Sequence, residues 1–87
     1  MLKRFLNLFS SGVWIIRADR GEVKVIKGTV PPRFVSDCRG VLQDAGILAG
    51  QIAGKQAGGY VTLEFSSEIP KQLHQRFRNL WADYDKR

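Results

Sequence analysis

The stretch GILAGQIAGKQAGG, residues 46–59, decides how the rest of the chain is interpreted. Its five glycines and its Gly-Lys pair resemble a phosphate-binding loop. Such a loop needs four residues between its first glycine and Gly-Lys, then Ser or Thr, and it opens a helix. Here Gly50 and Gly54 enclose three residues, Gln56 follows Lys55, and a strand pattern comes next. The spacing therefore favours a strand and a tight turn, with glycines that permit a bulge or a close backbone approach.

An internal repeat supports the strand interpretation. Residues 13–18 and 22–27 have the composition of two strands joined by a turn, and residues 51–56 and 60–66 occupy the equivalent places in the second unit. A helical apolar pattern also recurs, and its second copy is expected to begin at Ser67 as the N-cap. The matched helix positions are Val30, Pro31, Phe34, Cys38, Val41, Leu42 and Ala45 with Ile69, Pro70, Leu73, Phe77, Leu80, Trp81 and Tyr84, in that order.

The repeat defines the predicted fold class. The chain is expected to be α+β, a tandem ββα repeat in ββαββα order, because one such unit cannot bury its own apolar face. Two units, residues 13–46 and 47–87, would form one domain with a four-stranded, mainly antiparallel sheet and both helices on one face. Residues 1–12 would precede it as a short amphipathic segment.

Few residues suit catalysis. Cys38 is the single cysteine and His74 the single histidine in the chain, so an internal disulfide is impossible and a zinc site lacks ligands. Cys38 matches Phe77 in the repeat, which predicts a small core residue rather than a nucleophile. We expect no enzyme, catalytic residue, metal, cofactor or small-molecule substrate. One free cysteine fits a reducing, cytoplasmic compartment.

The charge points to an anionic partner. The chain has 14 Lys and Arg against 8 Asp and Glu, a net charge of +6, which favours RNA or DNA or an anionic membrane. The candidates for phosphate contact are Arg33, Lys71, Gln75, Arg76 and Arg78, mostly on the second helix. The open sheet face is expected to carry Glu22, Lys24, Ile26, Tyr60, Thr62, Glu64 and Ser66. Because only Tyr60 could stack on a base, phosphate contacts are favoured; a merely solvated helix face is the alternative.

The N-terminal MLKRFLNLF supports a different function. Leu2, Phe5, Leu6 and Phe9 would lie on the apolar side of a short amphipathic helix. They are candidates for contact with a membrane or a partner, and packing on the domain itself stays open. The alternative function is therefore a protein–protein adaptor or small homo-oligomer, held near a membrane by this segment.

Two short motifs resemble a known family. Val30-Pro31-Pro32-Arg33-Phe34 lies near the middle, and Gln75-Arg76-Phe77-Arg78-Asn79 follows an Ile-Pro pair near the end. Over roughly residues 21–81 the chain is similar to DUF3634, a family of small bacterial proteins of unknown function. The resemblance implies no activity, cofactor or catalytic residue. Several relatives have a membrane-spanning N-terminus, where this chain has MLKRFLNLF.

Overall fold

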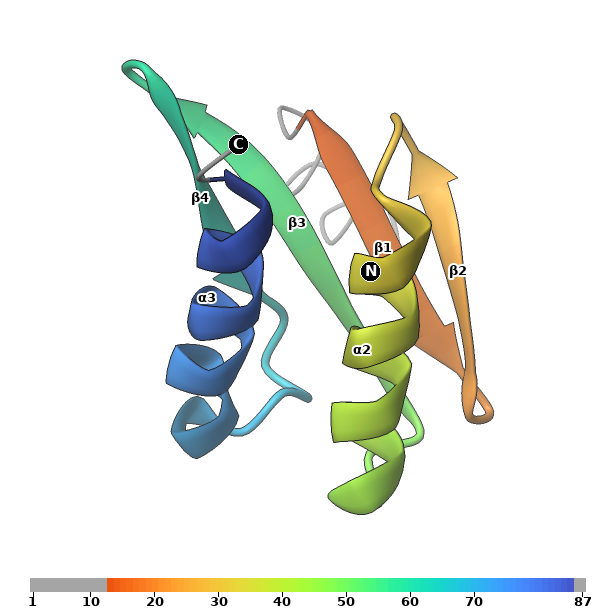
Figure 1. Ribbon diagram of the computed structural model, residues 1–87. Coiled ribbons are helices and arrows are strands. Elements are labelled where there is room, and N and C mark those ends of the chain that lie inside the picture. The colour runs from red at the N-terminus through yellow and green to blue at the C-terminus, as the bar shows by residue number, and fades with distance from the viewer. Residues whose placement is uncertain (1–12, 86–87) are drawn as a thin grey trace.

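The computed structural model describes residues 13–85, with side chains as far as Tyr84. The elements are β1 (Trp14–Asp19), β2 (Glu22–Lys27), α2 (Pro32–Asp44), β3 (Ala49–Ala57), β4 (Tyr60–Phe65) and α3 (Lys71–Asp85). Both helices lie on the same face of a single four-stranded sheet (Figure 1). The predicted α+β class and the ββαββα order are confirmed, and residues 46–59 contain strand β3 and its turn.

The strand pairing preserves the repeat. The sheet order is β2-β1-β3-β4 and every pair is antiparallel, so the first strands of the two units meet at the centre. In the first hairpin Asp19 pairs with Glu22, and in the second Ala57 pairs with Tyr60, at the equivalent positions of the repeat. Each hairpin closes with a two-residue turn. The first hairpin also has a bulge between Ile15 and Ile16 that the second lacks.

The core lies between the helices and the sheet. Phe34 and Cys38 of α2 and Phe77 of α3 are fully buried, facing β1 and β3 residues such as Ile16 and Ile52. An aromatic cluster joins the two units: the Trp14 ring lies 5.8 Å from Phe34 and 5.1 Å from Trp81, centroid to centroid. Such clusters stabilise a small core beyond the area they bury.

Gly54 makes room for that cluster. A Cβ at this position of β3 would overlap the indole of Trp14, so only glycine fits beneath the ring. Trp14 lies on the neighbouring strand, where it pairs directly with Gly54. The glycine that resembled part of a phosphate-binding loop therefore has a packing role.

The second helix begins later than expected. The predicted N-cap at Ser67 is wrong, because α3 starts at Lys71 and Ser67 lies in a turn. Ile69 precedes a proline, which disfavours helical backbone there. Instead, the Pro70 carbonyl accepts a hydrogen bond from the backbone amide of Leu73 at 3.0 Å. In the first unit the Pro31 carbonyl accepts the equivalent hydrogen bond from Phe34. Both helices thus start at equivalent positions of the repeat.

Candidate nucleic-acid interface

Helix α3 presents three cations that pair with no described carboxylate. Lys71, Arg76 and Arg78 are exposed, and within residues 13–84 no carboxylate lies within ion-pair distance of them. The helix sequence has no acidic residue before Asp83. Burial of Phe77 against the sheet fixes which way the helix is turned. The cations point to solvent because the apolar stripe occupies the side that faces the sheet.

The candidate residues on α3 fall on two flanks. Lys71, Gln75 and Arg78 have i, i+4, i+7 spacing and share one flank. Gln75 donates its side-chain amide to Asn79 Oδ1 at 2.9 Å. Arg76 is two residues from Arg78, which places it roughly 200° around the helix on the other flank. A single extended anion reaches Lys71 and Arg78 together more easily than Arg76.

The flank of Lys71, Gln75 and Arg78 contacts β4 through Arg78. The Phe65 ring stacks on His74 with centroids 4.0 Å apart, and the Arg78 guanidinium carbon lies 5.5 Å from the Phe65 centroid. His74 Nε2 donates to the Ile69 carbonyl at 3.0 Å. Arginine over an aromatic face gains a cation–π attraction and loses freedom. Sequence reasoning missed this group; the i, i+4 spacing of His74 and Arg78 was the available indication.

Arg33 is not part of that group. It lies on α2 beside a shallow hollow that Asp37, Asp83 and Tyr84 also line. The Tyr84 hydroxyl donates to Asp37 Oδ2 at 2.9 Å. Desolvation and the Asp37 carboxylate raise the pKa of Tyr84. Because Asp37 and Asp83 line this hollow together with Arg33, its electrostatic potential has contributions of both signs. Arg33 is therefore not grouped with the cations of α3.

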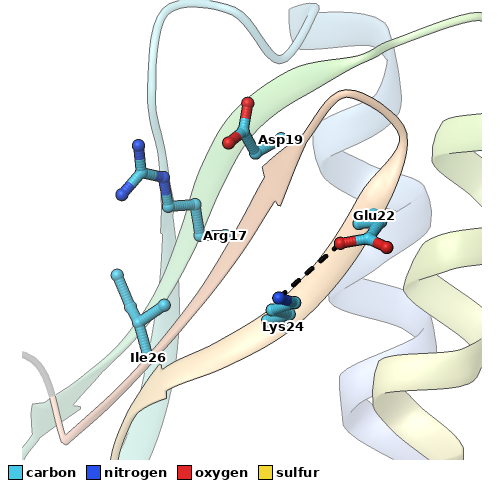
Figure 2. A pocket seen from close by; sticks show the side chains of 5 residues that line it. All are labelled: Arg17, Asp19, Glu22, Lys24 and Ile26. Atoms are coloured by element: carbon cyan, nitrogen blue, oxygen red, sulfur yellow. Dashed lines mark ion pairs between the residues drawn. The ribbon is translucent and has the colours of Figure 1, made fainter.

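The face opposite the helices carries paired charges. Figure 2 shows Arg17 and Asp19 of β1 beside Glu22, Lys24 and Ile26 of β2, with Lys24 Nζ 3.6 Å from Glu22 Oε1. A second pair, Lys55 with Glu64, has the same separation on β3 and β4. These lysines are compensated by neighbouring carboxylates, unlike the cations of α3.

The residues predicted for this face are not all exposed. Tyr60 is 58% exposed, but Ser66 is buried. The expectation that Ser66 belongs to an open face is wrong. Its Oγ accepts the backbone amide of Gln51 at 2.8 Å, since the chain turns there toward Ile69.

The net charge is unevenly distributed. Residues 13–85 hold ten of the fourteen Lys and Arg and all eight Asp and Glu, so this part contributes +2 of the net charge of +6. Residues 1–12 and 86–87 contribute the remaining +4. On the described part a basic surface therefore depends on local grouping, and α3 carries three of the ten cations there.

Cys38 is fully buried, and that burial, with the nearby Asp37 carboxylate, raises the pKa of its thiol to about 12. Residues 13–85 contain no group of three metal-ligating side chains. None of the helices in that range is long and apolar enough to cross a membrane. The membrane or partner candidates Leu2, Phe5, Leu6 and Phe9 lie outside the described residues.

The fold and the basic helix define a duplicated ββα protein with one chemically distinct unit. Residues 6–86 match the family DUF3634, described as a protein of unknown function. Because the match spans nearly the whole chain, this protein belongs to that family. No curated protein and no solved structure matches it.

Proposed function

We propose that this protein is a non-enzymatic, cytoplasmic binding module that contacts nucleic-acid phosphates through α3. The observation that carries the proposal is the set of cations on that helix, Lys71, Arg76 and Arg78, which have no carboxylate partner within residues 13–84. Phosphate contacts supply most of the affinity for nucleic acid that is independent of base sequence. Cations already paired with carboxylates are less available for them.

The flank of Lys71, Gln75 and Arg78 is the principal contact in this proposal. Arg78 is held over Phe65, so little side-chain freedom is lost when a phosphate binds it. Gln75 offers a neutral amide between the two cations. The exposed face of the sheet has a single prominent aromatic ring among the described residues, Tyr60, so base stacking is a minor contribution.

The test compares two variants of equal charge. Lys71→Gln with Arg78→Gln removes both cations of the principal flank of α3, whereas Lys24→Gln with Lys55→Gln removes two from the opposite face. Affinity for a short single-stranded RNA is measured by fluorescence anisotropy at several salt concentrations. The α3 variant is expected to bind about tenfold more weakly, with a salt slope smaller by about two. The control is expected to change little.

Two results would contradict the proposal. Equal losses in both variants would mean that only net charge matters. Unchanged binding in the α3 variant, with unaltered thermal unfolding, would assign the contact to another surface. Such a result would favour the adaptor or homo-oligomer function instead.

A further inference from the structure

Strand β2 forms one edge of the sheet, and its outer side pairs with no strand that the structure describes. Because the hairpin closes with a two-residue turn, Asp19 and Glu22 beside that turn are a hydrogen-bonded pair. Such pairs alternate with non-bonded pairs along antiparallel strands. The backbone amides and carbonyls of Val23 and Val25 therefore point away from β1. Apart from strand pairing, no residue in 13–85 forms a hydrogen bond with Val23 or Val25.

An open hollow lies along this edge, between β2 and α2. The residues that line it are Gly21, Glu22, Val23, Lys24, Arg39 and Gln43. Its volume of about 390 Å³ falls in the range of small ligand sites, so it has room for a side chain. Helix α2 packs beside β2 (Figure 1). A strand added to the edge of β2 would therefore place alternate side chains next to this helix.

Arg39 is the cation that the hollow offers to a ligand. It is exposed, and no carboxylate of residues 13–84 lies within ion-pair distance of it. Gln43 follows one turn later on the same side of α2 and adds a neutral donor. The other charges of the lining, Lys24 and Glu22, lie 3.6 Å apart and compensate each other. The hollow therefore has an excess of one positive charge, which suits a carboxylate.

The equivalent arginine of the second unit has a contact that Arg39 lacks. Arg39 and Arg78 are 39 residues apart, the same spacing that relates Phe34 to Leu73 in the helix repeat. The Arg78 guanidinium lies over the Phe65 ring of β4. Strand β2 contains no aromatic residue, so it offers Arg39 no such ring. The edge of β2 thus has a cation that its own strand does not engage.

An apolar side chain extends this surface along β2. Val25 is two residues from Val23, so both lie on the face that carries the helices. Val23 is 6% exposed and belongs to the core, whereas Val25 is 38% exposed. A side chain of an added strand that lies beside Val25 would contact an apolar surface. Two residues along that strand, the next side chain on this face would enter the hollow with Arg39.

We infer that the outer edge of β2 binds an extended peptide segment of another protein, with an acidic side chain in the hollow and an apolar one beside Val25. In this mode of recognition, main-chain hydrogen bonds supply affinity and pockets for alternate side chains supply specificity. Every strand pair of the sheet is antiparallel. A peptide strand of the same orientation carries its apolar residue two positions before its acidic one. The inference does not depend on nucleic-acid binding by α3.

Charge favours such a peptide over a second copy of this chain. In a symmetric pair of β2 edges, two hollows with the same excess of positive charge would face each other. An exposed lysine on an edge strand, here Lys24, also opposes pairing between identical chains. An acidic peptide gains attraction from the same charges.

The test titrates the isotope-labelled full chain with the capped peptide Ser-Thr-Val-Thr-Glu-Thr-Ser and follows backbone amide shifts. The largest shifts are expected at Val23 and Val25, because their amides gain acceptors. The matched peptide has Gln in place of Glu. It is expected to bind about fivefold more weakly, since hydrogen bonds between two ionised groups are the stronger ones.

Three variants locate the recognition of the acidic residue. Arg39→Gln should weaken binding of the Glu peptide about fivefold and leave the Gln peptide unchanged. Arg33→Gln is the matched control, because it changes another exposed arginine of α2 that does not line this hollow. Lys71→Gln with Arg78→Gln should also leave peptide affinity unchanged, which separates this surface from the cations of α3.

Four results would overturn the inference. Equal affinity for the Glu and Gln peptides in the unaltered protein would show that the hollow does not select a carboxylate. Absence of shifts along β2 at millimolar peptide would show that the edge does not accept a strand. Shifts confined to α3 or β4 would place the peptide elsewhere. Shifts at Val23 and Val25 that follow protein concentration without peptide would make a second copy the occupant.

Discussion

The two ββα units share a backbone plan and differ in chemistry. From the turn as far as Ile16 and Gly54 their hairpins have the same register, and their helices start with the same proline carbonyl contact. Yet α2 carries two cations and two acids, whereas α3 carries three cations before its first acid. The two units thus share the positions that set backbone geometry and differ at the outward positions.

The cores of the units are also unequal. Cys38 and Phe77 occupy equivalent, fully buried positions, but they differ greatly in volume. Trp14 of the first unit packs on Gly54 of the second, so a large residue in one unit fills space that a small residue leaves in the other. Each unit therefore completes its core only by packing against the other unit.

The largest expected effect comes from the equivalent core positions. Phe77→Ala should lower the free energy of unfolding by about 3–5 kcal/mol, because it leaves a large cavity. Cys38→Ala removes a single heavy atom and should cost only about 1 kcal/mol. Urea unfolding of both variants measures the difference. Similar losses would mean that the two helices do not contribute unequally to the core.

The contact between Trp14 and Gly54 gives the next effect. Gly54→Ala should destabilise the protein by about 1–3 kcal/mol, because the new methyl group overlaps the indole. Gly40→Ala is the matched control: it lies exposed in α2 with open space around it, and should stabilise by up to about 1 kcal/mol. Thermal unfolding of the pair checks this. A neutral Gly54→Ala would contradict the tight packing described for the central strands.

Alkaline pH should affect the first unit through Cys38. Below pH 9 its thiol is protonated whether the chain is folded or unfolded, so its contribution to stability is complete. Between pH 9 and about 12 the unfolded thiol ionises while the folded one, with its raised pKa, does not. The free energy of unfolding should then fall by about 1.4 kcal/mol per pH unit from this group.

Cys38→Ala isolates that contribution. Other groups titrate in the same range, so the measured quantity is the difference in slope between the original protein and the variant in urea unfolding from pH 8 to 11. The variant should lose stability less steeply. Equal slopes would show that the thiol ionises as readily in the folded chain as in the unfolded one.

The smallest effect concerns a polar contact between the units. Tyr84→Phe removes the hydrogen bond from α3 to Asp37 of α2 and should lower the free energy of unfolding only slightly, because the bond is exposed to solvent. Asn79→Ala removes a different exposed contact on α3 and serves as a comparison. If Tyr84→Phe destabilised the protein as much as Phe77→Ala does, this bond rather than the buried aromatic packing would hold the helices together.

Much of the fold was accessible from the sequence because it depends on local patterns. Alternation in residues 22–27 and 60–65 predicted two strands, and the internal repeat predicted that the hairpins would correspond. The start of α3 was missed because Ser67 and Glu68 resemble a cap, while the conformational restriction before Pro70 prevails.

The site was less predictable because it depends on contacts across the chain. Exposure of the α3 cations followed from the apolar stripe alone. Their division into two flanks and the contact of Arg78 with Phe65 required the relative placement of α3 and β4. The burial of Gln51 and Ser66 could not be predicted from the sequence either, because polar residues that alternate along a strand normally face solvent.

We propose that the second unit, and not the first, binds nucleic acid. The most direct measurement follows backbone amide shifts of the isotope-labelled full chain during titration with a short single-stranded RNA at two salt concentrations. We expect shifts along residues 71–82 and near Phe65, little change in α2, and affinity that falls steeply with salt. Equal shifts in both helices, or none at low salt, would contradict it.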